Sequence, residues 1–261
     1  MRFCNTMFSY FANPERFQNL AKWLAPPLMV FGLLGIAIGF GAGLFVVPVD
    51  YQQGEAVRMM YVHVPAAWLS SFAYAFMAVA SLISFVWRHN LADAAAKAAA
   101  PLGAAFTFLA LLTGALWGKP MWGAYWVWDA RLTSMLVLFF LYLGYMAVRT
   151  IVPDEARAAR LAAITAMVGA INLPIIKFSV DWWSSLHQSA SVFRAGGSTI
   201  DSSMLWPLLV GALGYTALFG WLVLVQMQTE LDQRHAVRLR RRMAGGRVSR
   251  PQAPQRSLDN A

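Results

Sequence analysis

The sequence predicts an all-α, polytopic membrane protein, a bundle of six transmembrane helices with an outer tryptophan-rich loop. Hydrophobic residues make up 59% of the chain and charged residues only 13%, which is typical of a protein that crosses a membrane several times. Six apolar runs match or approach the roughly 20 residues that a helix needs to cross a hydrocarbon core about 30 Å thick. We expect these spans at residues 24–47, 66–87, 98–117, 132–148, 161–176 and 204–225.

The six spans form one membrane domain, residues 24–226, between two polar ends. Residues 1–23 form an N-terminal segment. Residues 227–261 form a basic tail whose Pro/Gln/Ser-rich end we expect to be disordered. The only cysteine, Cys4, excludes a disulfide within the chain and a Cys-x-x-Cys redox centre.

Several spans contain residues that shape helices. In the first span, glycines that repeat every four residues favour close packing against another helix: Gly35, Gly39 and Gly43. Pro65 suits the first turn of the second span, so we expect His63 at the mouth of that span. The fifth span is short and contains Asn172 and Pro174.

The distribution of positive charge predicts the topology. Sixteen of the 21 lysines and arginines lie in the two termini and in the loops after the second and fourth spans. The positive-inside rule therefore places both termini in the cytoplasm and the other three loops on the opposite side, which is the periplasm in a Gram-negative bacterium. This topology also accounts for the net charge of +9, so we expect no nucleic-acid partner.

One outer loop, residues 117–133, holds four of the 11 tryptophans within twelve residues. Tryptophan and tyrosine gather at membrane interfaces, so one interpretation is an interfacial belt. Glycine and proline among the rings bend the backbone and let a ligand approach it, so the other interpretation is a shelf for a large planar ligand. Composition leaves both open. The expected shelf consists of Trp117, Gly118, Pro120, Trp122, Gly123, Tyr125, Trp126, Trp128 and Asp129.

The four histidines divide between the two sides of the membrane. His89 and His235 lie among basic residues on the cytoplasmic side, whereas His63 and His187 lie in the two outer loops that flank the shelf in the sequence. Haem fits these residues, because two neutral imidazoles can ligate its iron from opposite faces and indole rings can pack on the porphyrin. Candidates for pairing with the haem propionates are Arg131, Arg58, Arg194 and Lys119.

Two roles of the nearby aspartates stay open. A zinc site is the weaker alternative to haem, because Asp129 or Asp181 would have to complete a ligand set that the two histidines leave short. Asp129 is as well suited to capping the fourth span and pairing with Arg131 as to contacting a ligand.

The string Trp-Gly-Lys-Pro-Met-Trp-Gly…Trp-Val-Trp-Asp-Ala-Arg-Leu-Thr resembles the WWD signature of the haem-handling proteins of cytochrome c biogenesis. The resemblance is closest to the haem exporter protein C (CcmC) family and covers residues 20–230. It implies that His63 and His187 are the axial ligands of haem b, which is carried as cargo, and that the WWD segment is the haem platform.

The resemblance also implies a function and partners. Such a protein, embedded in the bacterial inner membrane, holds haem at the periplasmic face and delivers it to the haem chaperone CcmE. It works with the ABC-type pair CcmA and CcmB and with the small single-span protein CcmD. The chain has no Walker motif, so ATP hydrolysis belongs to a partner and we expect no enzyme activity of its own. Two residues depart from the family pattern, Tyr125 in place of a tryptophan and Met135 in place of an acidic residue.

Three alternatives remain. An ABC-transporter permease-like subunit would bind no chromophore. A bis-histidine membrane cytochrome that transfers electrons would place its histidines within the spans, whereas none lies mid-span here. A haem lyase with the same signature would be a longer chain with further histidines than the four present.

Overall fold

The structure is a computed structural model that describes residues 13–187, 191–194 and 196–248. The described part is helical and has no strand. Its elements are α2 (Pro14–Phe45), the 3-10 helix η1 (Glu55–Met59), α3 (Met60–Trp87), α4 (Asn90–Trp122), α5 (Ala130–Ile151), α6 (Glu155–Gly169), α7 (Asn172–Trp182) and α8 (Ser202–Val248). Six helical segments in this part are long and apolar enough to cross a membrane, which confirms the predicted fold class.

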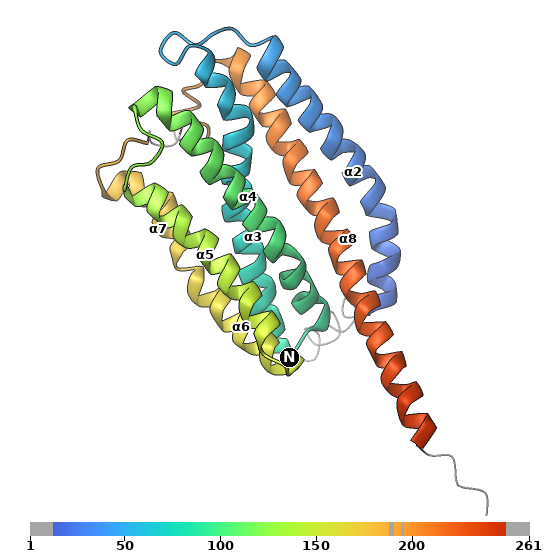
Figure 1. Cartoon of the computed structure of the whole chain (residues 1–261). Coiled ribbons are helices and arrows are strands. Elements are labelled where there is room, and N and C mark those ends of the chain that lie inside the picture. The colour runs from blue at the N-terminus through green and yellow to red at the C-terminus, as the bar shows by residue number, and fades with distance from the viewer. Residues whose placement is uncertain (1–12, 188–190, 195, 249–261) are drawn as a thin grey trace, which may run out of the picture.

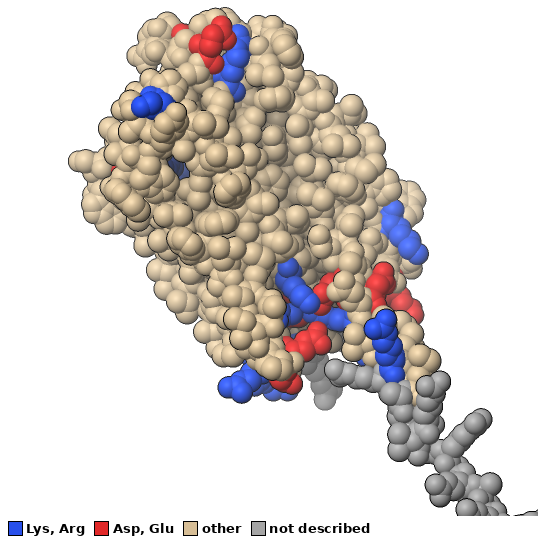
Figure 2. All heavy atoms as spheres, in the orientation of Figure 1, with Lys and Arg blue, Asp and Glu red and all other residues tan. Residues whose placement is uncertain are grey.

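The helices form a bundle with two distinct ends (Figure 1). We call the end where α4 stops at Trp122 and α5 starts at Ala130 the tryptophan end, and the opposite end, where α3 stops and α4 starts, the network end. Helices α2 and α8 run side by side, and α8 also contacts α3 and α4. On the face drawn in Figure 2, Lys, Arg, Asp and Glu gather toward the two ends, with a broad uncharged face between them.

Several helices run further than hydropathy predicts. Helix α4 contains Asp93 and Lys97, which the sequence interpretation put in a loop, and it includes the first part of the tryptophan-rich segment. Helix α8 continues to Val248 through residues assigned to the tail. Charged residues lower hydropathy without much loss of helix propensity, so hydropathy marks the apolar part of a helix and not its ends. The expected disorder at the end of the tail concerns residues 249–261, outside the described residues.

The second and fifth spans also differ from the expectation. Because η1 leads directly into α3, the helix has already begun at Met60, and His63 lies in its first turn. The fifth span is two helices, α6 and α7, which are separated at residues 170–171. Pro174 has no N–H to donate to the carbonyl of residue 170, so a continuous helix would lose a hydrogen bond there. The Asn172 side chain turns inward instead and donates from Nδ2 to the Ser134 carbonyl at 2.8 Å.

Glycines pack α2 against α8, as the spacing in the first span predicts. A Cβ atom added at Gly39 would lie 2.5 Å from the backbone nitrogen of Gly211, and one added at Gly35 would lie 2.8 Å from the Cα of Gly214. At Gly43 an added Cβ would collide with the ring of Tyr61, on α3. The two helices therefore touch through their backbones near the tryptophan end.

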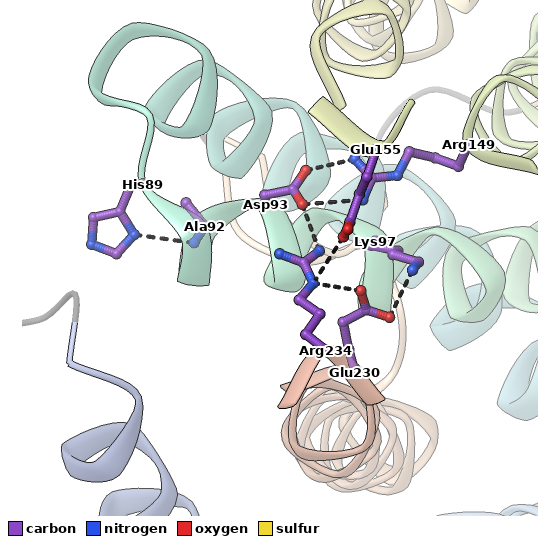
Figure 3. A network of polar contacts seen from close by, with 8 residues as sticks. All are labelled: His89, Ala92, Asp93, Lys97, Arg149, Glu155, Glu230 and Arg234. Carbon is purple, nitrogen blue, oxygen red and sulfur yellow. Dashed lines mark hydrogen bonds and ion pairs between the residues drawn. The ribbon is translucent and has the colours of Figure 1, made fainter. Parts of the chain in front are cut away.

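The network end is held by ion pairs among α4, α5, α6 and α8 (Figure 3). Both carboxylate oxygens of Asp93 accept from Arg149, at 2.7 and 3.0 Å, and one also accepts from Arg234 at 2.7 Å. Arg234 donates to Glu230 at 2.7 Å, and Glu230 pairs with Lys97 at 2.7 Å. His89, which lies between the predicted second and third spans, caps α4 by accepting the backbone N–H of residue 92.

Candidate functional site

His63 lies in the first turn of α3, where its ring faces α4. Its Nδ1 atom is 3.1 Å from Oγ1 of Thr113. The hydroxyl of Thr113 donates its only hydrogen to the Leu109 carbonyl, at 2.7 Å, so its oxygen accepts from the imidazole. The proton of the neutral ring therefore sits on Nδ1, and Nε2 keeps its lone pair.

Two further residues of α4, Trp117 and Gly114, lie against His63. The ring of Trp117 meets the imidazole edge-on, with ring centroids 5.5 Å apart, and its Nε1 donates to Oε1 of Gln53 at 3.2 Å. Gly114 leaves room for the imidazole, because a Cβ atom there would lie 2.9 Å from Cε1 of His63. The last turns of α4 thus hold one face of the imidazole in place.

His187 follows α7 and is anchored to the start of α5 through Asp129. Nδ1 of His187 is 2.9 Å from Oδ2 of Asp129, and the two side chains are 21% and 7% exposed. The Ser185 hydroxyl donates to the same oxygen at 2.7 Å and accepts the backbone N–H of His187 at 3.1 Å. The other oxygen, Oδ1, accepts the N–H of Leu132 at 2.7 Å and so caps α5, as expected for Asp129.

The charges of this pair follow from their surroundings. Burial lowers the pKa of His187 and outweighs the opposite effect of its hydrogen bond to Asp129. Burial raises the pKa of Asp129, but the hydrogen bonds from Leu132, Ser185 and His187 outweigh it, and the pKa is lowered overall. Near neutral pH the contact therefore joins a carboxylate to a neutral imidazole, whose Nδ1–H donates. As in His63, Nε2 of His187 keeps its lone pair.

The two histidines, far apart in the sequence, meet the same end of α4. Trp122 contacts His187 edge-on with ring centroids 4.8 Å apart, while Trp117 on the same helix contacts His63. The imidazoles are close enough for a charge on one to act on the other. The described part of the chain holds no group of three histidine, cysteine or carboxylate side chains placed to bind a metal ion.

The other predicted shelf residues have different surroundings. Gly118 is buried, and a Cβ atom there would lie 3.0 Å from the ring of Trp122. Pro120 lies exposed in the last turn of α4, and Gly123 ends that helix in the left-handed conformation with φ of 76°. Tyr125 is exposed, with the ammonium group of Lys119 5.3 Å from its ring centroid.

Beyond Tyr125 the segment presents two indole rings in contact. Trp126 and Trp128 meet edge-on with centroids 5.4 Å apart. Trp128 is 76% exposed, whereas Nε1 of Trp126 is buried and has no hydrogen-bond partner among the described residues. The Asp129 side chain points toward His187 and orients its imidazole through the hydrogen bond with Nδ1.

Of the four candidate cations, the structure brings Arg131 to the histidines, since its charge acts on both imidazoles. In the described part of the chain the guanidinium group of Arg131 forms no hydrogen bond or ion pair, whereas its backbone carbonyl accepts from the Ser134 hydroxyl. Arg58 instead donates to the carbonyls of residues 43 and 47 at the end of α2 and pairs with residue 55. Lys119 donates to the carbonyl of residue 123 at 3.0 Å, and Arg194 is exposed.

Sequence reasoning missed three residues that touch the site: Thr113, Ser185 and Gln53. Thr113 had a usable signal, because it lies one helical turn before Trp117 and is a hydroxyl within an apolar span. Ser185 and Gln53 lie in loops, where the sequence carries no periodicity that points to a contact.

Comparison with known proteins gives consistent relatives. The family model described as "Heme exporter protein C" matches residues 7–242. A protein of that name from Bradyrhizobium diazoefficiens is 59% identical over 223 residues, which cover 85% of this chain and 84% of the relative. Proteins of the same name from Escherichia coli and Paracoccus denitrificans are 45% and 39% identical, over 83% and 88% of this chain and 87% and 95% of their own lengths.

Proposed function

The chain belongs to the heme exporter protein C family, and from this premise we propose that it binds haem b between His63 and His187 and delivers it to the haem chaperone CcmE. One observation carries the proposal. At one end of the bundle two neutral imidazoles each give Nδ1–H to a protein acceptor and leave Nε2 without a hydrogen bond among the described residues. This is how proteins orient histidine for iron.

The remaining residues of the tryptophan end suit the rest of a haem molecule. Trp117 and Trp122 border the two imidazoles and offer indole surface to the porphyrin. Arg131 is half-buried, its guanidinium group has no hydrogen-bonding partner among the described residues, and it is the cation best placed for a propionate. Arg58 and Lys119 would have to give up local hydrogen bonds to take that role, and Arg194 remains an exposed candidate.

We further propose that the protein lies in the bacterial inner membrane with both termini in the cytoplasm. The positive-inside distribution supports this orientation and puts the tryptophan end in the periplasm. The family name indicates a component of haem export, and we propose that the chain has no enzyme activity of its own. In such a system the ABC-type pair CcmA and CcmB would hydrolyse ATP, and CcmD would be a further subunit of the complex.

An absorption spectrum of the protein, purified from membranes with the chaperone co-expressed, tests the proposal. Wild type should show a Soret band, and His63→Ala and His187→Ala should each lower the haem content and block loading of the chaperone. His235→Ala is the matched control, because His235 is exposed on α8, and its spectrum should match wild type. A wild type without a Soret band under conditions of plentiful haem would overturn the proposal and favour the permease alternative.

A further inference from the structure

We infer that the two axial histidines are unequal ligands: Asp129 and Thr113 are positioning residues that make His187 the retained ligand and His63 the ligand that leaves first during hand-over. This inference rests on the proposed haem site. It concerns the order in which the two iron–histidine bonds break. Neither the residues of the site nor the family name states that order.

The acceptor behind His187 is an anion held in one position. Oδ2 of Asp129 lies 2.9 Å from Nδ1 of His187 and also accepts from Ser185, while Oδ1 accepts from the backbone of Leu132. Because the carboxylate is fixed by several donors, it cannot turn away from the imidazole. A carboxylate that accepts from Nδ1–H raises the basicity of Nε2 and strengthens the bond from Nε2 to a metal.

The acceptor behind His63 is neutral. Oγ1 of Thr113 lies 3.1 Å from Nδ1 of His63, and its own hydrogen is directed to the Leu109 carbonyl. A hydroxyl oxygen fixes the orientation of the imidazole but adds no negative charge to it, so Nε2 of His63 is the weaker donor. The two ligands are equal in chemical type and differ in the charge behind them.

The backbone at the two histidines favours the opposite order, because a residue in a helix is held more firmly than a residue in a loop. His63 belongs to a helix, whereas His187 lies in the loop after α7. The loop position is tied at two points, however, because the hydroxyl of Ser185 accepts the backbone N–H of His187 and donates to Asp129. Loss of the His63 bond would open the α3 side of the iron to a ligand from the receiving protein while His187 still holds the haem.

The experiment compares haem loss from the full-length protein to apomyoglobin, used as the haem acceptor, in two backgrounds. His63→Gly, supplemented with imidazole, leaves His187 as the protein ligand, and His187→Gly with imidazole leaves His63. We expect His187→Gly to lose haem on the order of 10–100-fold faster than His63→Gly, which is the usual size of an outer-shell effect on metal binding. Equal rates, or a faster loss from His63→Gly, would overturn the inference.

Adding Asp129→Asn to each background identifies the cause. Asparagine still caps α5, so the fold should persist. Haem loss should accelerate in the His63→Gly background and stay unchanged in the His187→Gly background. Asp129→Asn in an otherwise native protein should also raise the reduction potential of the iron, because the anionic acceptor stabilises the ferric state. An Asp129→Asn effect of equal size in both backgrounds would mean that the residue is merely structural.

Thr113→Val and a matched control test the inference with both histidines in place. This comparison remains possible if the glycine variants retain no haem. In the native ligand background, Thr113→Val should accelerate haem loss less than Asp129→Asn does. Thr107→Val is the matched control, because Thr107 makes the same hydrogen bond to the carbonyl four residues earlier, that of Gly103, and no hydrogen bond to a histidine among the described residues. Its rate should equal wild type. A larger effect of Thr113→Val than of Asp129→Asn would contradict the inference, whereas a wild type without haem would instead refute the proposed function.

Discussion

Asp93 and Asp129 are both largely buried carboxylates, at opposite ends of the bundle, and they have different partners. Asp93, at the network end, accepts from two guanidinium groups that carry permanent charges. Asp129, at the tryptophan end, accepts from a neutral imidazole, a hydroxyl and a backbone N–H. In the first arrangement the carboxylate and the guanidinium groups neutralise one another. The second leaves the far nitrogen of the imidazole without a hydrogen bond among the described residues, which suits the proposed role of the tryptophan end in haem binding.

The two ends also differ in what holds their helices together. At the network end, residues from four helices are joined by charge, as Figure 3 shows. Near the tryptophan end, α2 and α8 are joined by direct backbone contact at Gly39 and Gly211. Near the tryptophan end, the described residues of α2 and α8 are thus held by close packing of their backbones and not by ion pairs between them.

The largest effect is expected from Asp93→Ala at the network end. The substitution leaves Arg149 and Arg234 without their shared carboxylate, and breaking a buried ion pair by removal of one partner costs about 3–5 kcal/mol. Thermal unfolding in detergent should show the loss of stability, with haem bound per folded molecule unchanged. Glu155→Ala is the control: this side chain is 67% exposed and lies 3.4 Å from Arg234, so its loss should cost about 0–1 kcal/mol. Loss of haem from folded Asp93→Ala protein would show that the ends are coupled.

A smaller effect is expected from Gly39→Ala in the seam between α2 and α8. The added methyl group would lie 2.5 Å from a backbone nitrogen that cannot move without its helix, and such overpacking costs about 1–3 kcal/mol. Gly41→Ala is the matched control on the same helix, where an added Cβ meets no atom within 4 Å. It should be neutral or stabilising by about 0.5–1 kcal/mol, the helix preference of alanine over glycine. Equal melting temperatures for the two variants would mean that the seam yields without cost.

The comparison also explains which features the sequence could predict. Hydropathy located the six spans, and the spacing of Gly35, Gly39 and Gly43 predicted the close helix contact, because both signals are local and periodic. The pairing of Asp93 with Arg234 has no such signal, since the two lie 141 residues apart, and hydropathy assigns Asp93 to a loop and Arg234 to the tail. The full length of α4 and α8 was missed for the same reason.

At the candidate site, residue type could be predicted and pairing could not. Histidines and tryptophans on one side of the membrane follow from topology, so His63 and His187 could be nominated from the sequence. Which acceptor each imidazole meets depends on tertiary packing, so Thr113 was overlooked and the hydrogen bond between His187 and Asp129 was not predicted. The sequence also did not indicate that Arg58 is bound to the end of α2.

The smallest effect, and the sharpest distinction between haem shelf and membrane belt, is expected from Trp122→Ala compared with Trp128→Ala. Trp122 contacts His187, whereas Trp128 is largely exposed and contacts Trp126. An aromatic contact of this kind contributes about 0.5–1.5 kcal/mol, so Trp122→Ala should weaken haem retention roughly threefold to tenfold, without a change in membrane insertion. Trp128→Ala should retain haem better than Trp122→Ala does, because its ring does not touch a proposed ligand. If both variants bind haem as wild type does and both insert poorly, the tryptophans act as an interfacial belt, and the functional difference between the two ends would rest on the histidines alone.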